Sequence, residues 1–190
     1  MRVIAGIAKG HKLLAPSGLK VRPTSDRVKE ALFNILSDRV QESLVLDLFA
    51  GSGALGIEAL SRGAAGCVFV ESDRKAVAMI EGNLEKTNFQ AKAEILKSSA
   101  SEALDRLFTR GQQFDLIFLD PPYRIKHTEL KEILETLSSK KLIKPTGKVV
   151  LEHSSKINII EIFELVGLRA DSSKKYGDTC LTFYSLAQAT

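Results

Sequence analysis

The sequence of 190 residues predicts an α/β fold: a mostly parallel sheet with an antiparallel C-terminal strand, preceded by a β-hairpin and a helix. From residue 44 onward, short apolar runs alternate with helical patterns, which is typical of parallel strands covered by helices on both faces. A glycine-rich turn follows the first of these runs. Near the C-terminus, two strand-like segments follow one another with no helix between them, which indicates an antiparallel hairpin.

The N-terminal part is predicted to form a hairpin and then a helix. Residues 2–7 and 11–15 are strand-like and flank a segment that is able to turn. After Pro23, apolar side chains at helical spacing predict one buried helix face: Val28, Ala31, Leu32, Ile35 and Leu36. We therefore divide the chain into a basic β-hairpin appendage, residues 1–22, and a main domain, residues 23–190.

The main domain is predicted to alternate between strands and helices. The predicted strands of its repeating part are residues 44–49, 67–70, 93–97, 114–119 and 148–151. The predicted helices are residues 54–62, 73–87 and 101–110, a helix marked by Leu130, Ile133, Leu134 and Leu137, and residues 158–166. The closing hairpin is predicted from residues 168–173 and 179–186.

Composition limits the class of protein. Hydrophobic residues make up 44% and charged residues 26% of the chain, which is close to the average of globular domains and excludes a wholly disordered chain. No apolar run approaches the ~18 residues of a membrane span, and the N-terminus lacks the apolar segment of a signal peptide. We expect a cytoplasmic protein. Cys67 and Cys180 form no C-x-x-C motif or Cys/His cluster, so we expect no metal site.

Positive charge is concentrated at the N-terminus. Residues 1–30 hold seven Lys and Arg but only two Asp and Glu, whereas the whole chain has a net charge of +4. The basic excess therefore lies entirely within these residues. A basic segment beside a nearly neutral domain favours a polyanionic partner such as a nucleic acid, although a solvated surface segment would look the same.

The glycine-rich turn predicts a Rossmann-like ligand site. Residues 51–56 match G-x-G-x-x-G between a predicted strand and a predicted helix, and Glu71 lies 20 residues after Gly51 at the end of the next strand. In such folds this turn approaches a nucleotide-like ligand, and the later carboxylate accepts hydrogen bonds from the ribose hydroxyls. A tight turn without a ligand is the structural alternative.

Asp47 separates two candidate ligands of this turn. It lies four residues before Gly51, near the end of an otherwise apolar strand. A carboxylate there would repel the pyrophosphate of a dinucleotide, whereas S-adenosylmethionine carries an ammonium and a sulfonium. Opposite charges ~4 Å apart attract by about 4 kcal/mol at an effective dielectric constant of ~20, before desolvation. The acid favours S-adenosylmethionine, unless Asp47 instead bonds backbone amides of the turn.

A second motif, Asp120-Pro121-Pro122-Tyr123, follows the predicted strand 114–119. Proline supplies a carbonyl but no N–H, and an ionised aspartate only accepts hydrogen bonds. The loop is therefore rich in acceptors and carries an aromatic ring. Such a loop suits a heteroaromatic amine, whose N–H groups donate to the Asp120 carboxylate and the Pro121 carbonyl while its ring stacks on Tyr123. An ordinary turn at the end of a strand is the alternative.

These motifs resemble those of known enzymes. Residues 47–53 resemble the first motif of class I S-adenosylmethionine-dependent methyltransferases. Together with residues 120–123 they resemble the amino-methyltransferases that modify exocyclic nitrogens of bases. Across nearly the whole chain the sequence is similar to the bacterial RsmD family, most specifically in residues 22–36 and also in residues 2–6, 10–13 and 175–179. This resemblance implies transfer of a methyl group from S-adenosylmethionine to guanine N2 in 16S ribosomal RNA. The implied partner is 16S rRNA, the 30S subunit or an assembly intermediate, with no membrane and no metal.

The resemblance also implies roles for individual residues. The cofactor-binding set is Asp47, Phe49, Gly51, Gly53, Glu71, Ser72 and Ser99. The catalytic set is Asp120, Pro121, Pro122 and Tyr123. The RNA-binding set is Lys9, Lys12, Lys20, Arg22 and Arg27. One departure stands out: related enzymes often place Asp or Asn near the cofactor adenine, where this chain has Ser99.

Three other functions remain open from the sequence. A DNA adenine-N6 methyltransferase would use the same loop chemistry, but it usually needs a larger target-recognition region. An RNA-binding assembly factor with a decayed site would not need both motifs intact. A nicotinamide dehydrogenase would explain the glycines but not Asp47 or the proline loop. His153, at the end of the fifth predicted strand, is interpreted as a structural residue.

Overall fold

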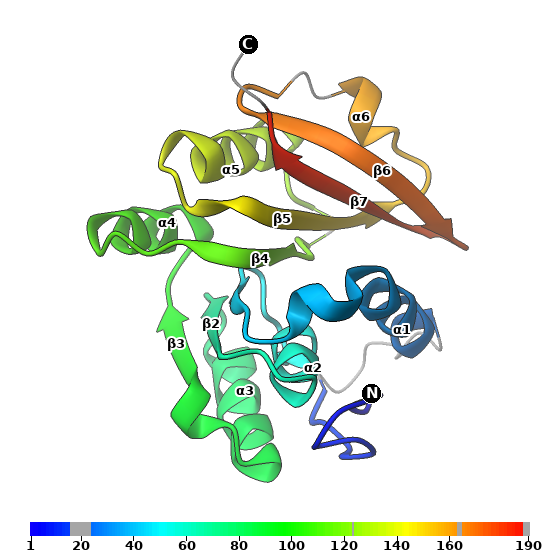
Figure 1. The fold of residues 1–190 in the computed structure, drawn as a ribbon, viewed down its shortest axis with the longest axis vertical. Coiled ribbons are helices and arrows are strands. Elements are labelled where there is room, and N and C mark those ends of the chain that lie inside the picture. Colours follow the sequence, from blue (N-terminus) through cyan, green and yellow to red (C-terminus); the bar gives the residue numbers. More distant parts are fainter. Residues whose placement is uncertain (16–23, 123, 163–164, 188–190) are drawn as a thin grey trace.

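The computed structural model describes residues 1–15, 24–122, 124–162 and 165–187. Its core is a sheet of seven strands in the order β3-β2-β1-β4-β5-β7-β6 (Figure 1). The strands are β1 (Leu44–Asp47), β2 (Gly66–Glu71), β3 (Ala93–Lys97), β4 (Phe114–Leu119), β5 (Ile143–Ser154), β6 (Leu168–Tyr176) and β7 (Thr179–Leu186). The first five are parallel, whereas β7 runs antiparallel between β5 and β6. The predicted fold class is confirmed.

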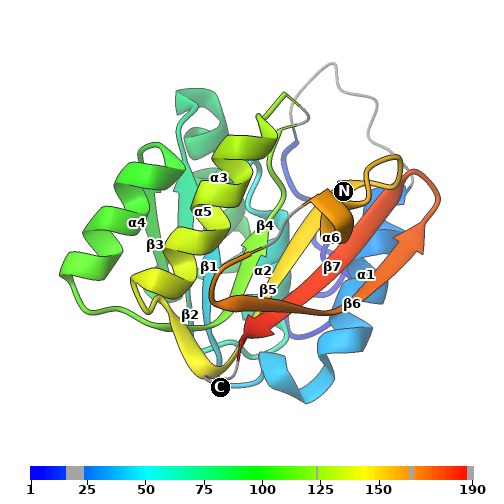
Figure 2. The ribbon, with the colours of Figure 1, turned by 90° about the horizontal axis from the view of Figure 1, so that it is seen from above.

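Helices cover both faces of the sheet. They are α1 (Thr24–Leu36), α2 (Ala54–Ser61), α3 (Arg74–Thr87), α4 (Ala100–Thr109), α5 (His127–Ser139) and the short α6 (Ile159–Ile162), with 3₁₀ turns at Ser37–Val40 and Gln90–Lys92. Apolar side chains of α1, α2 and α3 share one core cluster, and those of α4 and α5 share the other, on the opposite face (Figure 2). In the described ranges, no helix has the length and apolar character that a membrane crossing needs.

The sheet differs from the predicted pattern near its C-terminal end. β5 extends to Ser154, beyond the predicted end at residue 151, because its last residues pair with the start of β7. The helix expected over residues 158–166 is described only over Ile159–Ile162, and Leu165 is not helical. The chain leaves the helix before Gly167, which has a left-handed φ of 80° and precedes β6.

The first 15 residues, called the N-terminal segment below, form the expected reversal without regular strands. The Val3 N–H donates to the His11 carbonyl at 3.0 Å, and the Val3 carbonyl accepts from the Gly10 N–H at 2.9 Å. One isolated bridge joins Arg2 and Lys12. Side chains of the segment are buried in the same cluster as those of α1, α2 and α3. The boundary we expected between residues 22 and 23 lies outside the described residues, so the two-part division stays a proposal.

Candidate active site

The predicted site residues meet at the carboxyl edge of the parallel strands, where α/β sheets bind ligands. They line a cavity of about 520 Å³, a size typical of small-molecule sites. From the predicted sets, its wall includes Asp47, Phe49, Gly51, Glu71, Ser72, Ser99, Asp120 and Pro122. Residues far apart in the sequence are brought together because each follows or ends a neighbouring strand.

Both glycines of the turn have a left-handed backbone conformation, and they differ in what surrounds them. Gly51 has a φ of 55° and Gly53 a φ of 77°, values that favour glycine. The Gly53 N–H donates to the Ala50 carbonyl at 2.7 Å, and a Cβ there would lie 3.3 Å from the Phe69 ring. Gly51 lines the cavity, whereas Gly53 shapes the turn and caps the start of α2.

The structure shows the backbone contact that the sequence left open for Asp47 and also places the residue on the cavity wall. Its Oδ2 accepts a hydrogen bond from the Gly56 N–H at 3.0 Å, and its side chain also lines the cavity. The residue is 1% exposed. Burial raises the pKa of Asp47 to about 7, the Gly56 bond opposes the rise, and the nearby Asp120 and Glu71 add to it. A cationic ligand in the cavity would favour the ionised carboxylate.

Glu71, which we predicted to accept hydrogen bonds from the ribose, binds the backbone of the glycine turn. Its Oε2 accepts from the Gly51 N–H at 2.9 Å and its Oε1 from the Asp73 N–H at 2.8 Å. Each oxygen of an ionised carboxylate has about two acceptor positions, so hydroxyl donors from the cavity can still be accommodated. Glu71 is therefore able to fix the turn and to accept ribose hydroxyls together.

Ser99 has a local role that the sequence analysis missed. Its hydroxyl accepts from the Glu102 N–H at 3.3 Å, and the Glu102 carboxylate accepts from the Ser99 N–H at 3.2 Å. This capping box begins α4. Because the hydroxyl oxygen is engaged in the cap, Ser99 reaches a ligand best as an O–H donor.

In the part of the chain that is described, no three His, Cys, Asp or Glu side chains are grouped to hold a metal ion.

Asp120 lies where three cavities meet. Asp120 lines the cavity of about 520 Å³, which we call the cofactor-sized cavity below. It also lines a cavity of about 70 Å³ with Pro121 and Pro122, and a cavity of about 90 Å³ with Lys29. Burial raises the pKa of Asp120 to about 6, although the residue keeps a surface exposed to solvent. The Pro122 carbonyl accepts from the Ile125 N–H at 2.9 Å and shapes the loop. Tyr123 lies outside the described residues.

A second carboxylate, Glu152, was not predicted. It lies on β5 beyond the expected strand end and lines both smaller cavities beside Asp120. Its position at the carboxyl end of a strand next to β4 was the available signal. The neighbouring His153 also lines the cavity of about 70 Å³, and both of its ring nitrogens have partners, which agrees with the structural role that we expected. Its Nε2 lies 2.8 Å from the Thr182 hydroxyl and its Nδ1 3.0 Å from the Ser154 carbonyl.

The predicted RNA-binding residues are only partly described. Lys9, Lys12 and Arg27 are exposed, whereas Lys20 and Arg22 lie outside the described residues. The exposure of Lys9, Lys12 and Arg27 leaves these side chains accessible to a phosphate group, and their role in RNA binding stays a prediction.

Known proteins are similar to this chain over nearly its whole length. A family model described as "Conserved hypothetical protein 95" matches residues 1–185. YlbH of Bacillus subtilis, a candidate rRNA methyltransferase, is 40% identical over 185 residues, which cover 97% of this chain and 98% of that protein. The ribosomal RNA small subunit methyltransferase D of Buchnera aphidicola subsp. Acyrthosiphon pisum is 36% identical over 159 residues, covering 83% and 80%.

Solved structures show the same relationship. The Escherichia coli protein yhhF, a candidate methyltransferase, has a TM-score of 0.82 and 30% identity, covering 98% of this chain and 97% of that chain. RsmC, a 16S rRNA N2 methyltransferase of T. thermophilus solved with AdoMet and guanosine, has a TM-score of 0.67 and 27% identity. The superposed region covers 90% of this chain and 45% of the RsmC chain. The protein described above therefore belongs to the RsmD family, the family of ribosomal RNA small subunit methyltransferase D.

Proposed function

We propose that the protein transfers the methyl group of S-adenosylmethionine to the exocyclic N2 amine of a guanine in 16S ribosomal RNA. Membership of the family supports the reaction class, which is S-adenosylmethionine-dependent methylation of ribosomal RNA. The observation that carries the choice of guanine is a pair of carboxylates, Asp120 and Glu152, beside the cofactor-sized cavity.

The two carboxylates favour guanine because of the hydrogen-bonding groups that it presents. Leu119 of β4 pairs with Leu151 of β5, so Asp120 and Glu152 are the next residues on two strands about 4.8 Å apart. Both line the same small cavity. Guanine places N1–H next to the N2 amine and so offers donors to both acids. Adenine and cytosine place an acceptor nitrogen next to the amine, which an ionised carboxylate would repel.

The residues of the site then divide the work of the reaction. When bound, S-adenosylmethionine would supply an electrophilic methyl group on its positively charged sulfur, and the neutral thioether would be the leaving group. Asp47 would accept hydrogen bonds from the cofactor ammonium, and Glu71 from its ribose hydroxyls. Asp120 would accept a hydrogen bond from N2, orient its lone pair and take up the proton that methylation releases. The raised pKa of Asp120, about 6, suits a group that takes a proton and returns it to water.

The basic residues would hold the RNA. Lys9, Lys12 and Arg27 are exposed, and we include Lys20 and Arg22 from the sequence. If the guanine is stacked in its RNA, it must be splayed out to reach Asp120. Binding that depends on phosphate contacts weakens as salt concentration rises.

The test is methyl transfer with product identification. The purified protein is incubated with S-adenosylmethionine carrying a tritiated methyl group and with 16S rRNA, either naked or within 30S particles. The RNA is then digested to nucleosides. We expect labelled N2-methylguanosine with the wild-type protein and none with Asp120→Ala, used as the matched control. Labelled N6-methyladenosine, or no labelled nucleoside from either substrate, would refute the proposal.

A further inference from the structure

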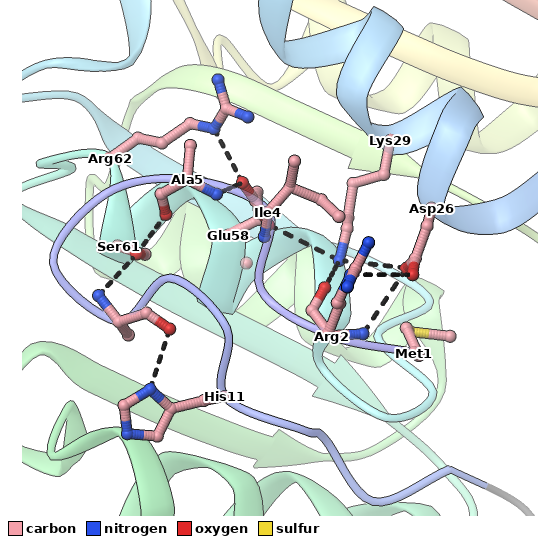
Figure 3. Close-up of polar contacts among 12 residues, drawn as sticks. Met1, Arg2, Ile4, Ala5, His11, Asp26, Lys29, Glu58, Ser61 and Arg62 are labelled. Carbon is pink, nitrogen blue, oxygen red and sulfur yellow. Dashed lines mark hydrogen bonds and ion pairs between the residues drawn. The ribbon is translucent and has the colours of Figure 1, made fainter.

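The structure contains a buried carboxylate, Glu58 of α2, that binds the N-terminal segment. Glu58 is 0% exposed. Its Oε2 accepts from the Ile4 N–H at 2.7 Å and its Oε1 from the Ala5 N–H at 3.0 Å, while the Arg62 guanidinium lies 2.8 Å from Oε1 (Figure 3). A buried charge is tolerated only when it is paired and hydrogen-bonded. These contacts therefore fix the backbone of the segment on α2.

A second residue of α2 holds the same segment. The Ser61 hydroxyl donates to the Ala5 carbonyl at 2.6 Å and accepts from the Ala8 N–H at 3.0 Å. Between these contacts lies Gly6, with a φ of 83°. A Cβ at this position would lie 1.8 Å from the Ser61 carbonyl oxygen, closer than any real contact. Only glycine allows the segment to lie this close to the helix.

α1 binds the segment from the other side through Lys29. Its Nζ donates to the Arg2 carbonyl at 2.6 Å and lies 3.5 Å from the Glu58 carboxylate and 3.9 Å from that of Asp26. Lys29 is 4% exposed. Figure 3 shows the Lys29 ammonium between Glu58 and Asp26. The start of the segment is thus bound to α1 and α2 together.

Asn83 of α3 ties the far end of the segment to the glycine turn. Its side-chain oxygen accepts from the Leu14 N–H at 2.6 Å. Its side-chain nitrogen donates to the Leu14 carbonyl at 3.1 Å and to the Ser52 carbonyl at 2.8 Å. Asn83 is 0% exposed. One buried amide therefore joins the segment to the turn that lines the cofactor-sized cavity.

The segment also reaches the cavities and the surface. Met1 lines the cofactor-sized cavity and also the cavity of about 90 Å³ that Asp120 and Lys29 line. The Ser52 hydroxyl lies 3.8 Å from the Met1 sulfur. Lys9 and Lys12, which we propose to contact RNA, are exposed on the same segment. A displacement of the segment would therefore change the wall of the cofactor cavity and the placement of the RNA contacts at the same time.

We propose that Glu58 and Asn83 are positioning residues: Glu58 holds the N-terminal segment on α2, and Asn83 joins it to the glycine turn. Affinity for S-adenosylmethionine then depends on the docking of this segment. The inference rests on the proposed function, since it takes the ligand of the cavity to be that cofactor. It also implies reciprocity: whatever orders the segment strengthens cofactor binding, and the cofactor orders the segment.

The test compares two glycines of the segment that have left-handed φ values. Gly6→Ala forces the segment off α2, whereas a Cβ at Gly10, with a φ of 89°, would meet nothing within 4 Å. Each full-length variant is titrated with S-adenosylmethionine in a calorimeter, without RNA, after thermal unfolding has shown that it is folded. We expect Gly6→Ala to bind about tenfold more weakly than wild type and Gly10→Ala to stay within about twofold.

A measurement on the wild-type protein keeps the test decisive if Gly6→Ala does not fold. Hydrogen exchange of the Ile4, Ala5 and Ala8 amides is followed with and without saturating S-adenosylhomocysteine. We expect exchange of these amides to slow when the ligand is bound. Equal cofactor affinity in the two glycine variants, or amide exchange that the ligand leaves unchanged, would overturn the inference. Failure of the proposed function would be seen separately, as wild-type protein that binds the cofactor but makes no N2-methylguanosine.

Discussion

Replacing Glu58 by alanine should lower the free energy of unfolding by about 3–5 kcal/mol, the usual cost of breaking a buried ion pair from one side. The substitution leaves the buried Lys29 ammonium with Asp26 as its remaining carboxylate, 3.9 Å away. It also removes the acceptor of the Ile4 and Ala5 N–H groups. With a urea m-value of about 2 kcal/mol per M, a loss of about 4 kcal/mol lowers the unfolding midpoint by about 2 M. Circular dichroism at increasing urea concentration measures this shift.

A surface ion pair provides the control for that measurement. Arg110 lies 2.6 Å from Glu94, which is shorter than any contact of Glu58, but both side chains are about half exposed. Exposed pairs contribute less than about 1 kcal/mol, so Glu94→Ala should move the midpoint by about 0.5 M or less. If Glu58→Ala shifted the midpoint no further than Glu94→Ala, burial would not be what makes the Glu58 contacts stabilising.

Four further predictions concern the site. The folded-state pKa of Asp47 is raised to about 7, above ~3.9 in the unfolded chain, so stability from this group is lost as the pH rises from about 4 to about 7. Asp47→Asn should flatten thermal unfolding temperatures measured across that range. Asp120→Ala should lower the methylation rate by about 100-fold or more while calorimetry shows cofactor affinity largely unchanged; retained methylation would contradict its role. Neutralising Lys9 and Lys12 should weaken RNA binding and reduce the slope of log affinity against log salt concentration by about 1.5, as measured by filter binding. Glu152→Gln should lower kcat/KM for RNA by about tenfold without changing cofactor affinity, and an unchanged kcat/KM would remove Glu152 from guanine recognition.

The strands and the main site motifs were predictable because their signals are local. A glycine turn between a strand and a helix, followed by an acid at the end of the next strand, identifies one edge of a parallel sheet. Asp120 follows another strand of the same sheet, so the topology brings it to that edge without any further information. This is why Asp47, Glu71 and Asp120 could be placed around one cavity before the structure was known.

Other parts of the site depend on tertiary pairing, which a single sequence does not reveal. Glu152 lies beyond the predicted strand end because antiparallel pairing with β7 extends β5. Ser99 lines the cavity as expected, but its second role, the capping of α4 through Glu102, depends on a local hydrogen-bond pair that the sequence analysis did not predict. Glu58 reads in the sequence as one charged residue in an apolar helix. Apart from Arg62, its partners lie far along the chain, up to 54 residues away.

Two buried acids, Glu58 of α2 and Asp47 at the end of β1, differ in how many charged and polar partners compensate their burial. Glu58 has two cations and two backbone amides as partners, which suits a fixed structural contact. Asp47 has the Gly56 amide, while Asp120 and Glu71 lie near enough to raise its pKa. The ionised Asp47 carboxylate is therefore poorly stabilised in the free protein. A bound cation would stabilise it by a direct charge attraction. The same buried carboxylate that destabilises the free protein as the pH approaches neutral is the group that we expect to attract a cationic ligand.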